Sequence, residues 1–277
     1  MDFESAPTPV SGNVRFAVSH EKNDKFSVHY HACYEIYYFV DGDADYQVEG
    51  RVYHLTPHSL VLLSPNVFHG VKINSRTDYV RCSVHFYPES LAAERRSFLL
   101  SPFPGSKKND PKEVFYEKTE EFGLHAFFEH LVRSQTRPKA LREACYPIFL
   151  ESLLAQISVM CQALKPSEAA VTAPDHITEI IRYLNEHLAD PITLDGLSES
   201  FYISKYYMNR AFKKATGTTV MDYLIYKRIV MARQLMLNGH TASDAAALTG
   251  FGDYSSFYRA YKKVTGRNPG ADKGGGN

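Results

Sequence analysis

The segment Arg210-Ala211-Phe212-Lys213-Lys214-Ala215-Thr216-Gly217 occurs a second time, 49 residues later, as Arg259-Ala260-Tyr261-Lys262-Lys263-Val264-Thr265-Gly266. Six of the eight positions are identical, and the other two exchange Phe for Tyr and Ala for Val. A segment repeated with this similarity indicates one supersecondary unit that the chain uses twice. The repeat therefore predicts the architecture of the carboxy-terminal part of the chain.

Each copy is predicted to be a helix-turn-helix. In the first copy, a helix over residues 193–201 is followed by the turn Tyr202-Ile203 and a helix over 204–216. In the second copy, helices over 242–249 and 253–265 are joined by the turn Gly250-Phe251-Gly252. The residues able to cap the helix starts in this region are Thr193 or Asp195, Ser204, Thr218 or Thr219, Thr241 or Ser243, and Asp253.

The second helix of a helix-turn-helix enters the major groove of DNA. Arg210 and Arg259 fall in the middle of the two predicted recognition helices. Arg can pair with guanine and Asn with adenine through two hydrogen bonds, whereas Lys and hydroxyl groups contact phosphates or either base. The residues predicted to contact DNA are Ser204, Lys205, Tyr206, Tyr207, Asn209, Arg210, Lys213, Tyr254, Ser255, Ser256, Tyr258 and Arg259.

A helix predicted over residues 219–237 connects the two units. At ~1.5 Å per residue its length is roughly 28 Å, whereas successive major grooves on one face of DNA lie about 34 Å apart. One chain is therefore predicted to place its two recognition helices in neighbouring grooves. The alternative is a helical scaffold that does not bind DNA, in which the paired lysines only favour the helix ends and Phe212 and Tyr261 are core residues.

Composition and charge are those of an ordinary folded protein. Hydrophobic residues make up 44% and charged residues 22%. Residues 174–277 hold 13 Lys and Arg against 10 Asp and Glu, a net charge of +3, and the remainder carries −3, so the sign suits DNA binding. Cys33, Cys82, Cys145 and Cys161 are scattered, which favours reduced thiols. Without an export signal or a long apolar run, the sequence predicts a cytoplasmic protein that does not enter a membrane.

Residues 175–267 resemble the DNA-binding domain of the AraC/XylS family of bacterial regulators. The resemblance depends on the segment 206–213, on Tyr223-Leu224 with Arg228 and Ala232, and on the segment 249–257. It implies two helix-turn-helix units joined by a long helix, double-stranded promoter DNA as a partner and RNA polymerase as a further one. The family usually ends with Pro, two residues, an aromatic residue and Arg, whereas here Pro269 is followed by Gly270-Ala271-Asp272-Lys273.

The rest of the chain is predicted to have a different structure. Short strands such as Tyr34–Val40 and Val80–Phe86 alternate with turns, which is typical of an antiparallel barrel. Helices follow near 119–135 and over 139–164, where Pro147 should kink the second helix or delay its start. The predicted fold is thus α+β and multidomain. Its parts are a barrel over 1–87, a helical extension over 88–165, a linker over 166–174 and an all-α domain with two helix-turn-helix units over 175–277.

The barrel segment also resembles the cupin family. Two histidines one residue apart, a glutamate and a downstream histidine form this pattern: His29, His31, Glu35 and His69. Three imidazoles and one carboxylate can hold a divalent metal, which leaves a cupin-type metalloenzyme as an alternative. Cupin-like barrels are also sensors in AraC-type regulators, and many hold no metal. We therefore expect no metal, no other cofactor and no catalysis.

A small-molecule effector inside the barrel is the preferred interpretation, because a barrel of this size holds one ligand. Aromatic, His, Glu and Arg side chains suit a sugar or a related polar metabolite. The residues predicted to bind the effector are His29, His31, Glu35, Tyr37, Tyr46, His69, Arg81 and His85; the alternative is that the tyrosines only fill the barrel. The helix over 139–164 has an apolar stripe that is predicted either to pack on the barrel or to form a homodimer contact. The stripe consists of Leu141, Cys145, Ile148, Leu154, Ile157, Cys161 and Leu164. A regulator whose barrel serves only for dimerisation is therefore a further alternative.

Overall fold

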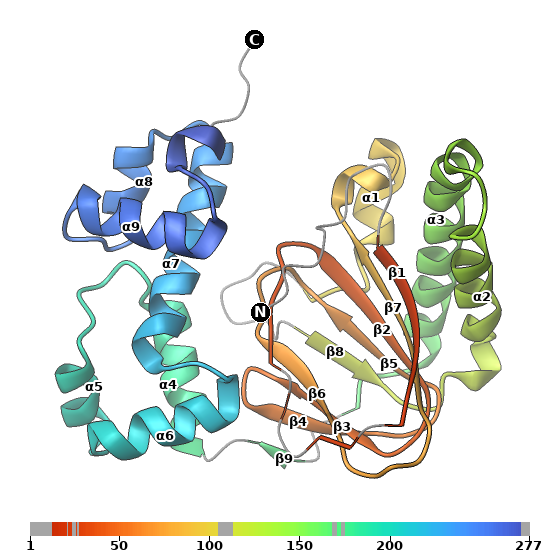
Figure 1. The fold of residues 1–277 in the computed structure, drawn as a ribbon, viewed down its shortest axis with the longest axis horizontal. Helices are drawn as coiled ribbons and strands as arrows, with labels where there is room; N and C mark the ends of the chain where they lie inside the picture. The colour runs from red at the N-terminus through yellow and green to blue at the C-terminus, as the bar shows by residue number, and fades with distance from the viewer. Residues whose placement is uncertain are drawn as a thin grey trace. The chain divides into compact units, whose positions relative to one another are not determined.

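The computed structural model describes residues 13–20, 22–23, 26, 28–104, 113–167, 171–172 and 175–272. The chain forms two compact units, of which the first ends at Val171 and the second begins at Thr172. The first unit is built on β-sheets with helices, and the second is helical (Figure 1). The predicted α+β class, with a β-rich amino-terminal unit and an all-α carboxy-terminal one, is confirmed.

Two sheets form the first unit. The larger has the strand order β1-β7-β2-β5-β8 and the smaller the order β6-β3-β4-β9, and the neighbouring strands whose register is known pair antiparallel. The strands are β1 (Asn13–Ser19), β2 (Tyr34–Asp41), β3 (Ala44–Val48), β4 (Arg51–Leu55), β5 (Ser59–Leu63), β6 (His69–Ile73), β7 (Tyr79–Phe86), β8 (Glu113–Tyr116) and β9 (Val171–Thr172).

Each face of the larger sheet has its own core. Even-numbered residues of β2 and β7, among them Ile36, Tyr38 and Val84, pack with the helices. Odd-numbered residues, among them Tyr37 and Tyr79, pack with residues of the smaller sheet. Because side chains alternate along a strand, the larger sheet is covered on both faces, and the space between the two sheets is the barrel interior.

Helices cover the outer face of the larger sheet, where α2 and α3 lie side by side (Figure 1). The helical elements of this unit are η1 (Pro88–Ser90), α1 (Ala93–Leu99), η2 (Glu120–Phe122), α2 (Leu124–Ser134) and α3 (Lys139–Ala163). By length and composition alone α3 could cross a membrane, but its buried residues pack on the sheet, as in the core helix of a folded domain. Pro147 lies within α3 and does not delay its start.

The predicted apolar stripe of α3 is partly wrong. Leu154 and Ile157 are buried, but Leu141 is 49% exposed and Ile148 63% exposed. The buried face instead also includes Tyr146, Leu150, Leu153 and Met160. The helix is apolar around much of its circumference, so spacing alone does not fix the face that meets the sheet.

Two further differences concern the boundaries of the barrel. β8 lies in the segment predicted to be a helical extension, and it pairs with β5 at the edge of the larger sheet. β9 lies in the predicted linker and joins the smaller sheet beside β4. The barrel therefore uses residues beyond 87. Residues 168–170 and 173–174 of the predicted linker lie outside the described residues.

The second unit contains the two predicted helix-turn-helix units. Its helices are α4 (Asp175–Glu186), α5 (Leu194–Ser200), α6 (Lys205–Thr216), α7 (Val220–Leu237), α8 (Ala242–Leu248), α9 (Tyr254–Thr265) and η3 (Pro269–Asp272). Side-chain oxygens cap the starts of α5 to α9, and the capping residues are Thr193, Ser204, Thr219, Thr241 and Asp253. Each cap satisfies a backbone N–H that the helix leaves unpaired, and the predicted starts are confirmed.

Arg228, in the middle of α7, ties the two halves of this unit together. Its Nε donates to the Leu188 carbonyl at 2.7 Å and its Nη2 to the Asp190 carbonyl at 2.6 Å, both in the loop between α4 and α5. The guanidinium also lies 6.0 Å from the Phe251 ring centroid in the turn between α8 and α9. Gly250 adjoins this contact with a φ of +79°.

Gly250→Ala should destabilise the second unit. A Cβ at this position would lie 2.7 Å from the Ala189 carbonyl oxygen, and a non-glycine residue at positive φ costs about 1–3 kcal/mol by itself. Calorimetry of the full chain should show the transition of this unit at a lower temperature. Gly252→Ala in the same turn is the matched control, because no atom lies within 4 Å of its Cβ position. Equal melting temperatures for the two variants would contradict this account.

Candidate DNA-binding and effector-binding sites

Helices α6 and α9, the second helices of the two helix-turn-helix units, expose most of the residues predicted to contact DNA. Tyr206 is 78% exposed, and Arg210 and Arg259 are exposed on the two helices. The other exposed members of the predicted set are Ser204, Lys205, Tyr207, Lys213, Tyr254 and Ser255, and the half-buried members are Asn209, Ser256 and Tyr258. Phe212 and Tyr261 are fully buried, in line with a core role for both.

Several members of the set are already held by contacts within the unit. Asn209 Oδ1 accepts a hydrogen bond from the Val220 backbone N–H at 3.2 Å. A side-chain amide needs both its oxygen and its nitrogen to pair with adenine. Asn209 therefore joins the middle of α6 to the start of α7, and in this conformation it does not present both groups to a base.

Ion pairs and hydrogen bonds also position other polar side chains. Lys205 Nζ lies 2.5 Å from Asp195 Oδ1, which links the start of α6 to α5. Arg259 Nη2 donates to Ser256 Oγ at 3.3 Å on α9. In the described part of the chain, no side chain forms a hydrogen bond or ion pair with Arg210, so the two repeat arginines differ in how they are held.

Tyr202 is an exposed residue that the sequence did not single out. It lies in the turn between α5 and α6, is 96% exposed and has a φ of +54°. Two residues later, Ser204 caps α6, so Tyr202 lies just before the amino-terminal end of that helix. A tyrosine in a short turn is equally compatible with burial, so its exposure carries no signal in the sequence.

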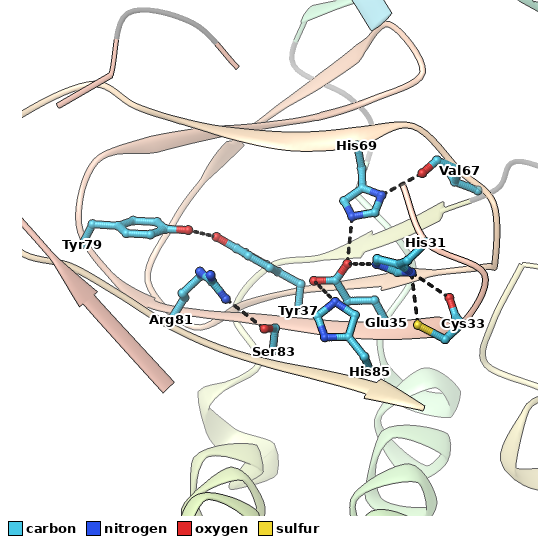
Figure 2. A network of polar contacts seen from close by, with 10 residues as sticks. All are labelled: His31, Cys33, Glu35, Tyr37, Val67, His69, Tyr79, Arg81, Ser83 and His85. Carbon is cyan, nitrogen blue, oxygen red and sulfur yellow. Dashed lines mark hydrogen bonds and ion pairs between the residues drawn. The ribbon is translucent and has the colours of Figure 1, made fainter. Parts of the chain in front are cut away.

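A second polar site lies inside the barrel (Figure 2). The odd-numbered residues of β7, Tyr79, Arg81, Ser83 and His85, share the strand face that looks into the barrel, because Tyr79 belongs to the interior core. In the register with β2, His85 lies opposite Glu35 and Ser83 opposite Tyr37. The structure thus brings the predicted Glu35, Tyr37, Arg81 and His85 together from two paired strands.

Three imidazoles surround the buried carboxylate of Glu35, which is 5% exposed. The Nε2 atoms of His31 and His69 each lie 2.9 Å from Glu35 Oε2, and His85 Nε2 lies 3.6 Å from Oε1 (Figure 2). Burial alone would raise the pKa of Glu35, but His85 and His69 and the hydrogen bond from His31 hold it well below its usual range. Burial likewise opposes charge on His31, yet hydrogen bonds to Cys33 and Glu35 raise its pKa to about 10.

The same side chains have a donor set that fits a divalent cation. His31 Nδ1 donates to the Cys33 carbonyl at 3.0 Å and His69 Nδ1 to the Val67 carbonyl at 2.8 Å, so both Nε2 atoms face Glu35. Metal-binding imidazoles are commonly oriented in this way. His69 Nε2 is buried and, despite its short contact with Glu35, has no hydrogen bond of good geometry. When no cation is bound, a protonated His31 provides one positive charge beside the Glu35 carboxylate.

His29 lies at the edge of this group. It forms an isolated β-bridge with His69, with backbone hydrogen bonds of 2.8 and 3.0 Å, and its ring is exposed. The ligand atoms of His29, His31 and His69 lie within 4.8 Å of one another, as do those of His31, Glu35 and His85. The four residues predicted as a metal set are therefore neighbours, but His29 faces the surface.

Tyrosines and Arg81 occupy the neighbouring part of the interior. The hydroxyl groups of Tyr37 and Tyr79 are hydrogen-bonded to each other, and the Tyr46 ring centroid lies 4.4 Å from that of Tyr37. Arg81 Nη1 donates to Ser83 Oγ at 2.8 Å. Tyr79 and Ser83 were missed by sequence reasoning, although their spacing of two from Arg81 and His85 places them on the same strand face.

Glu35→Gln should destabilise the first unit by about 3–5 kcal/mol, because the variant leaves a buried imidazolium without its counter-ion. Urea unfolding of the full chain at neutral pH measures this change. Asp45→Asn is the matched control, because Asp45 Oδ1 also lies 2.9 Å from a histidine, His54, which is 57% exposed. An exposed pair contributes less than about 1 kcal/mol. A similar loss in both variants would show that the buried network has no special role.

Family models and relatives agree with this organisation. Residues 12–158 match the model of the AraC-like ligand-binding domain, and residues 197–273 match that of a helix-turn-helix domain. The HTH-type transcriptional regulator YbfI of Bacillus subtilis is 27% identical over 235 residues, which cover 83% of this chain and 81% of the relative. The HTH-type transcriptional activator RhaS of Salmonella schwarzengrund is 27% identical over 120 residues, 43% of either chain.

Among solved structures, ToxT from Vibrio cholerae is similar over 93% of this chain and 97% of its own, with 13% identity and a TM-score of 0.36. The family assignment comes from the two models, of which the ligand-binding one covers more than half of the chain. The order of the two matched domains is also that of the two compact units. The chain belongs to the AraC family of DNA-binding transcription regulators, with an AraC-like ligand-binding domain followed by a helix-turn-helix domain.

Proposed function

We propose that this regulator inserts α6 and α9 into neighbouring major grooves of its promoter, and that an effector bound in the barrel alters this binding. The observation that carries the proposal is the exposure of Arg210 and Arg259 on two recognition helices joined by α7. The 18 residues of α7 span roughly 27 Å, against the ~34 Å between successive grooves. The contacts of Arg228 with the loop before α5 and with Phe251 support a fixed spacing.

The proposed roles of the residues differ. Arg210 and Arg259 contact base edges, and Tyr206 and Tyr254 contact bases or the thymine methyl group. Asn209 positions the first recognition helix rather than contacting a base. The remaining proposed contacts are to phosphates and sugars, from Ser204, Lys205, Tyr207, Lys213, Ser255, Ser256 and Tyr258.

The barrel is proposed to bind a small polar metabolite such as a sugar. The interior groups named above provide hydrogen-bond donors, acceptors and aromatic faces for such a ligand. The predicted effector residues His29, His31, Glu35, Tyr37, Tyr46, His69, Arg81 and His85 keep this proposed role, and Tyr79 and Ser83 join them. The relatives YbfI and RhaS are transcription regulators, which supports a barrel that senses rather than catalyses.

We further propose a cytoplasmic homodimer that acts on RNA polymerase at the promoter. The exposed Leu141, Ile148 and Val159 on α3 support a contact between two copies of the first unit. The family assignment supports the promoter and the polymerase as partners.

Arg210→Ala and Arg259→Ala should each weaken binding to the regulator's own promoter by about 1–3 kcal/mol, because each removes two hydrogen bonds to a base. Fluorescence anisotropy with a labelled promoter fragment at fixed salt measures the affinity. Arg182→Ala is the control, because it removes an exposed cation from α4, outside both recognition helices. Affinity that is unchanged in both repeat variants would exclude α6 and α9 as the recognition helices.

An effector should raise the melting temperature of the full chain and change its promoter affinity. Ligand at about 100 times its Kd stabilises a protein by roughly 2.7 kcal/mol, and promoter DNA must change effector affinity by the same factor. A panel of sugars and related metabolites, chosen from the genes beside the coding sequence, supplies the candidates. If no member changes either quantity, effector sensing fails, while promoter binding is tested independently by the arginine variants.

A further inference from the structure

We infer that the effector carries a carboxylate group, bound by Arg81, with a hydroxyl group close to it. This inference rests on the proposed effector-binding function of the barrel and names the chemical class of the ligand: a small hydroxycarboxylate.

The first observation is that β7 turns its polar face inward. Cys82, Val84 and Phe86 are buried beneath the helices, which leaves Arg81, Ser83 and His85 on the face that looks into the barrel. Side chains that only fill a barrel are apolar, because a buried polar group is unfavourable unless it is paired. A polar row on an interior face is therefore typical of a ligand site.

The second observation is the charge balance of the interior. The carboxylate of Glu35 is already contacted by three imidazoles. Arg81 is charged at all physiological pH values. In the described part of the chain, no carboxylate lies within 4.0 Å of its guanidinium. Among the described residues, the guanidinium of Arg81 is thus an interior cation with no carboxylate in contact with it.

The third observation is how Arg81 is held. Its contacts are with neutral groups: Ser83 Oγ at 2.8 Å, the Tyr37 ring with its centroid at 5.9 Å, and a hydrogen bond with Tyr79. A guanidinium has five N–H donors in one plane. Two neutral oxygens do not use all five, so donors remain for an incoming ligand. Arg81 is half-buried, so it is partly shielded from water and is still accessible to a ligand.

A carboxylate fits this site better than a neutral sugar or a phosphate. One guanidinium pairs with one carboxylate through two parallel hydrogen bonds, and a single negative charge balances the single unpaired cation. A phosphate monoester brings about 1.5 to 2 negative charges and three acceptor oxygens. A neutral sugar leaves the cation uncompensated in a poorly hydrated site, which is costly.

The hydroxyl group follows from the neighbours of Arg81. Tyr37 and Tyr79 share one hydrogen bond, and each phenolic oxygen can accept two hydrogen bonds and donate one. The pair therefore keeps one donor and further acceptor sites beside the guanidinium. A hydroxyl group on the carbon next to the carboxylate can use both, and Glu35 and His85 lie farther along the same two strands for additional hydroxyl groups.

The smallest hydroxycarboxylate, glycolate, is the probe, because it has no shape or stereochemistry to be rejected. Thermal unfolding of the full chain is followed at constant ionic strength with sodium glycolate, ethylene glycol or inorganic phosphate, each at about 50 mM. Glycolate should raise the melting temperature of the first unit by about 3–6 °C, the shift expected of a ligand at about ten times its Kd. Ethylene glycol and phosphate should give smaller shifts.

Arg81→Met should abolish the glycolate shift, and without ligand it should melt at or above the wild-type temperature because the buried unpaired charge is gone. Arg133→Met is the matched control: it removes a cation that is 75% exposed on α2 and should keep the full shift. Ser83→Ala keeps the cation but loses the hydroxyl that orients it, so a reduced shift is expected there even if Arg81→Met does not fold.

Two sets of results would overturn the inference. One is an absent glycolate shift, or one that is equal in the wild type and in a folded Arg81→Met or Ser83→Ala variant. The other is an equal or larger shift with ethylene glycol or phosphate, which would assign the site to neutral or phosphorylated ligands. If neutral sugars change promoter affinity while glycolate does not bind, effector sensing stands and only the carboxylate class fails.

Discussion

The structure of the first unit depends on a strand that is covered on both faces. β7 lies between β1 and β2, and its even-numbered residues, such as Val84 and Phe86, need an apolar cover that α2 and α3 provide. Its odd-numbered residues then have to lie in the barrel interior. A polar side chain placed there requires a partner, and both the imidazoles around Glu35 and the hydrogen bond from Arg81 to Ser83 meet this requirement.

In the second unit, the main constraint is the spacing of the two exposed helices α6 and α9. Helices α6 and α9 bury apolar residues, Phe212 on α6 and Tyr261 on α9, and expose their arginines. The spacing depends on α7 and on Arg228, which contacts one loop from each half of the unit. Since two surface helices bind DNA together only when their separation matches the groove repeat, the contacts of Arg228 bear on the proposed DNA binding.

Features that depend on near neighbours in the sequence were predicted, whereas features that depend on tertiary packing were not. The starts of α5 to α9 followed from capping residues such as Ser204 and Asp253, because a cap is a bond between near neighbours in sequence. β8 and β9 were missed because strands of four and two residues are defined by their partners, not by their own pattern. The exposed Ile148 and the hydrogen bond of Asn209 to Val220 likewise depend on packing that spacing does not encode. For the barrel, the motif His29, His31, Glu35 and His69 located the polar site in the sequence. Alternation along β7 groups the other polar residues on one face of that strand. Which face of β7 lies in the interior is decided by the packing of the helices on the opposite face.

The most direct test of the central claim, that one chain uses two helix-turn-helix units in neighbouring grooves, is a base-resolution footprint of the promoter with the wild type, Arg210→Ala and Arg259→Ala. The account predicts that each variant loses protection over a different short segment and that the centres of the two segments lie about 10–10.5 base pairs apart. Loss of the same segment in both variants, or segments on opposite faces of the duplex, would contradict it.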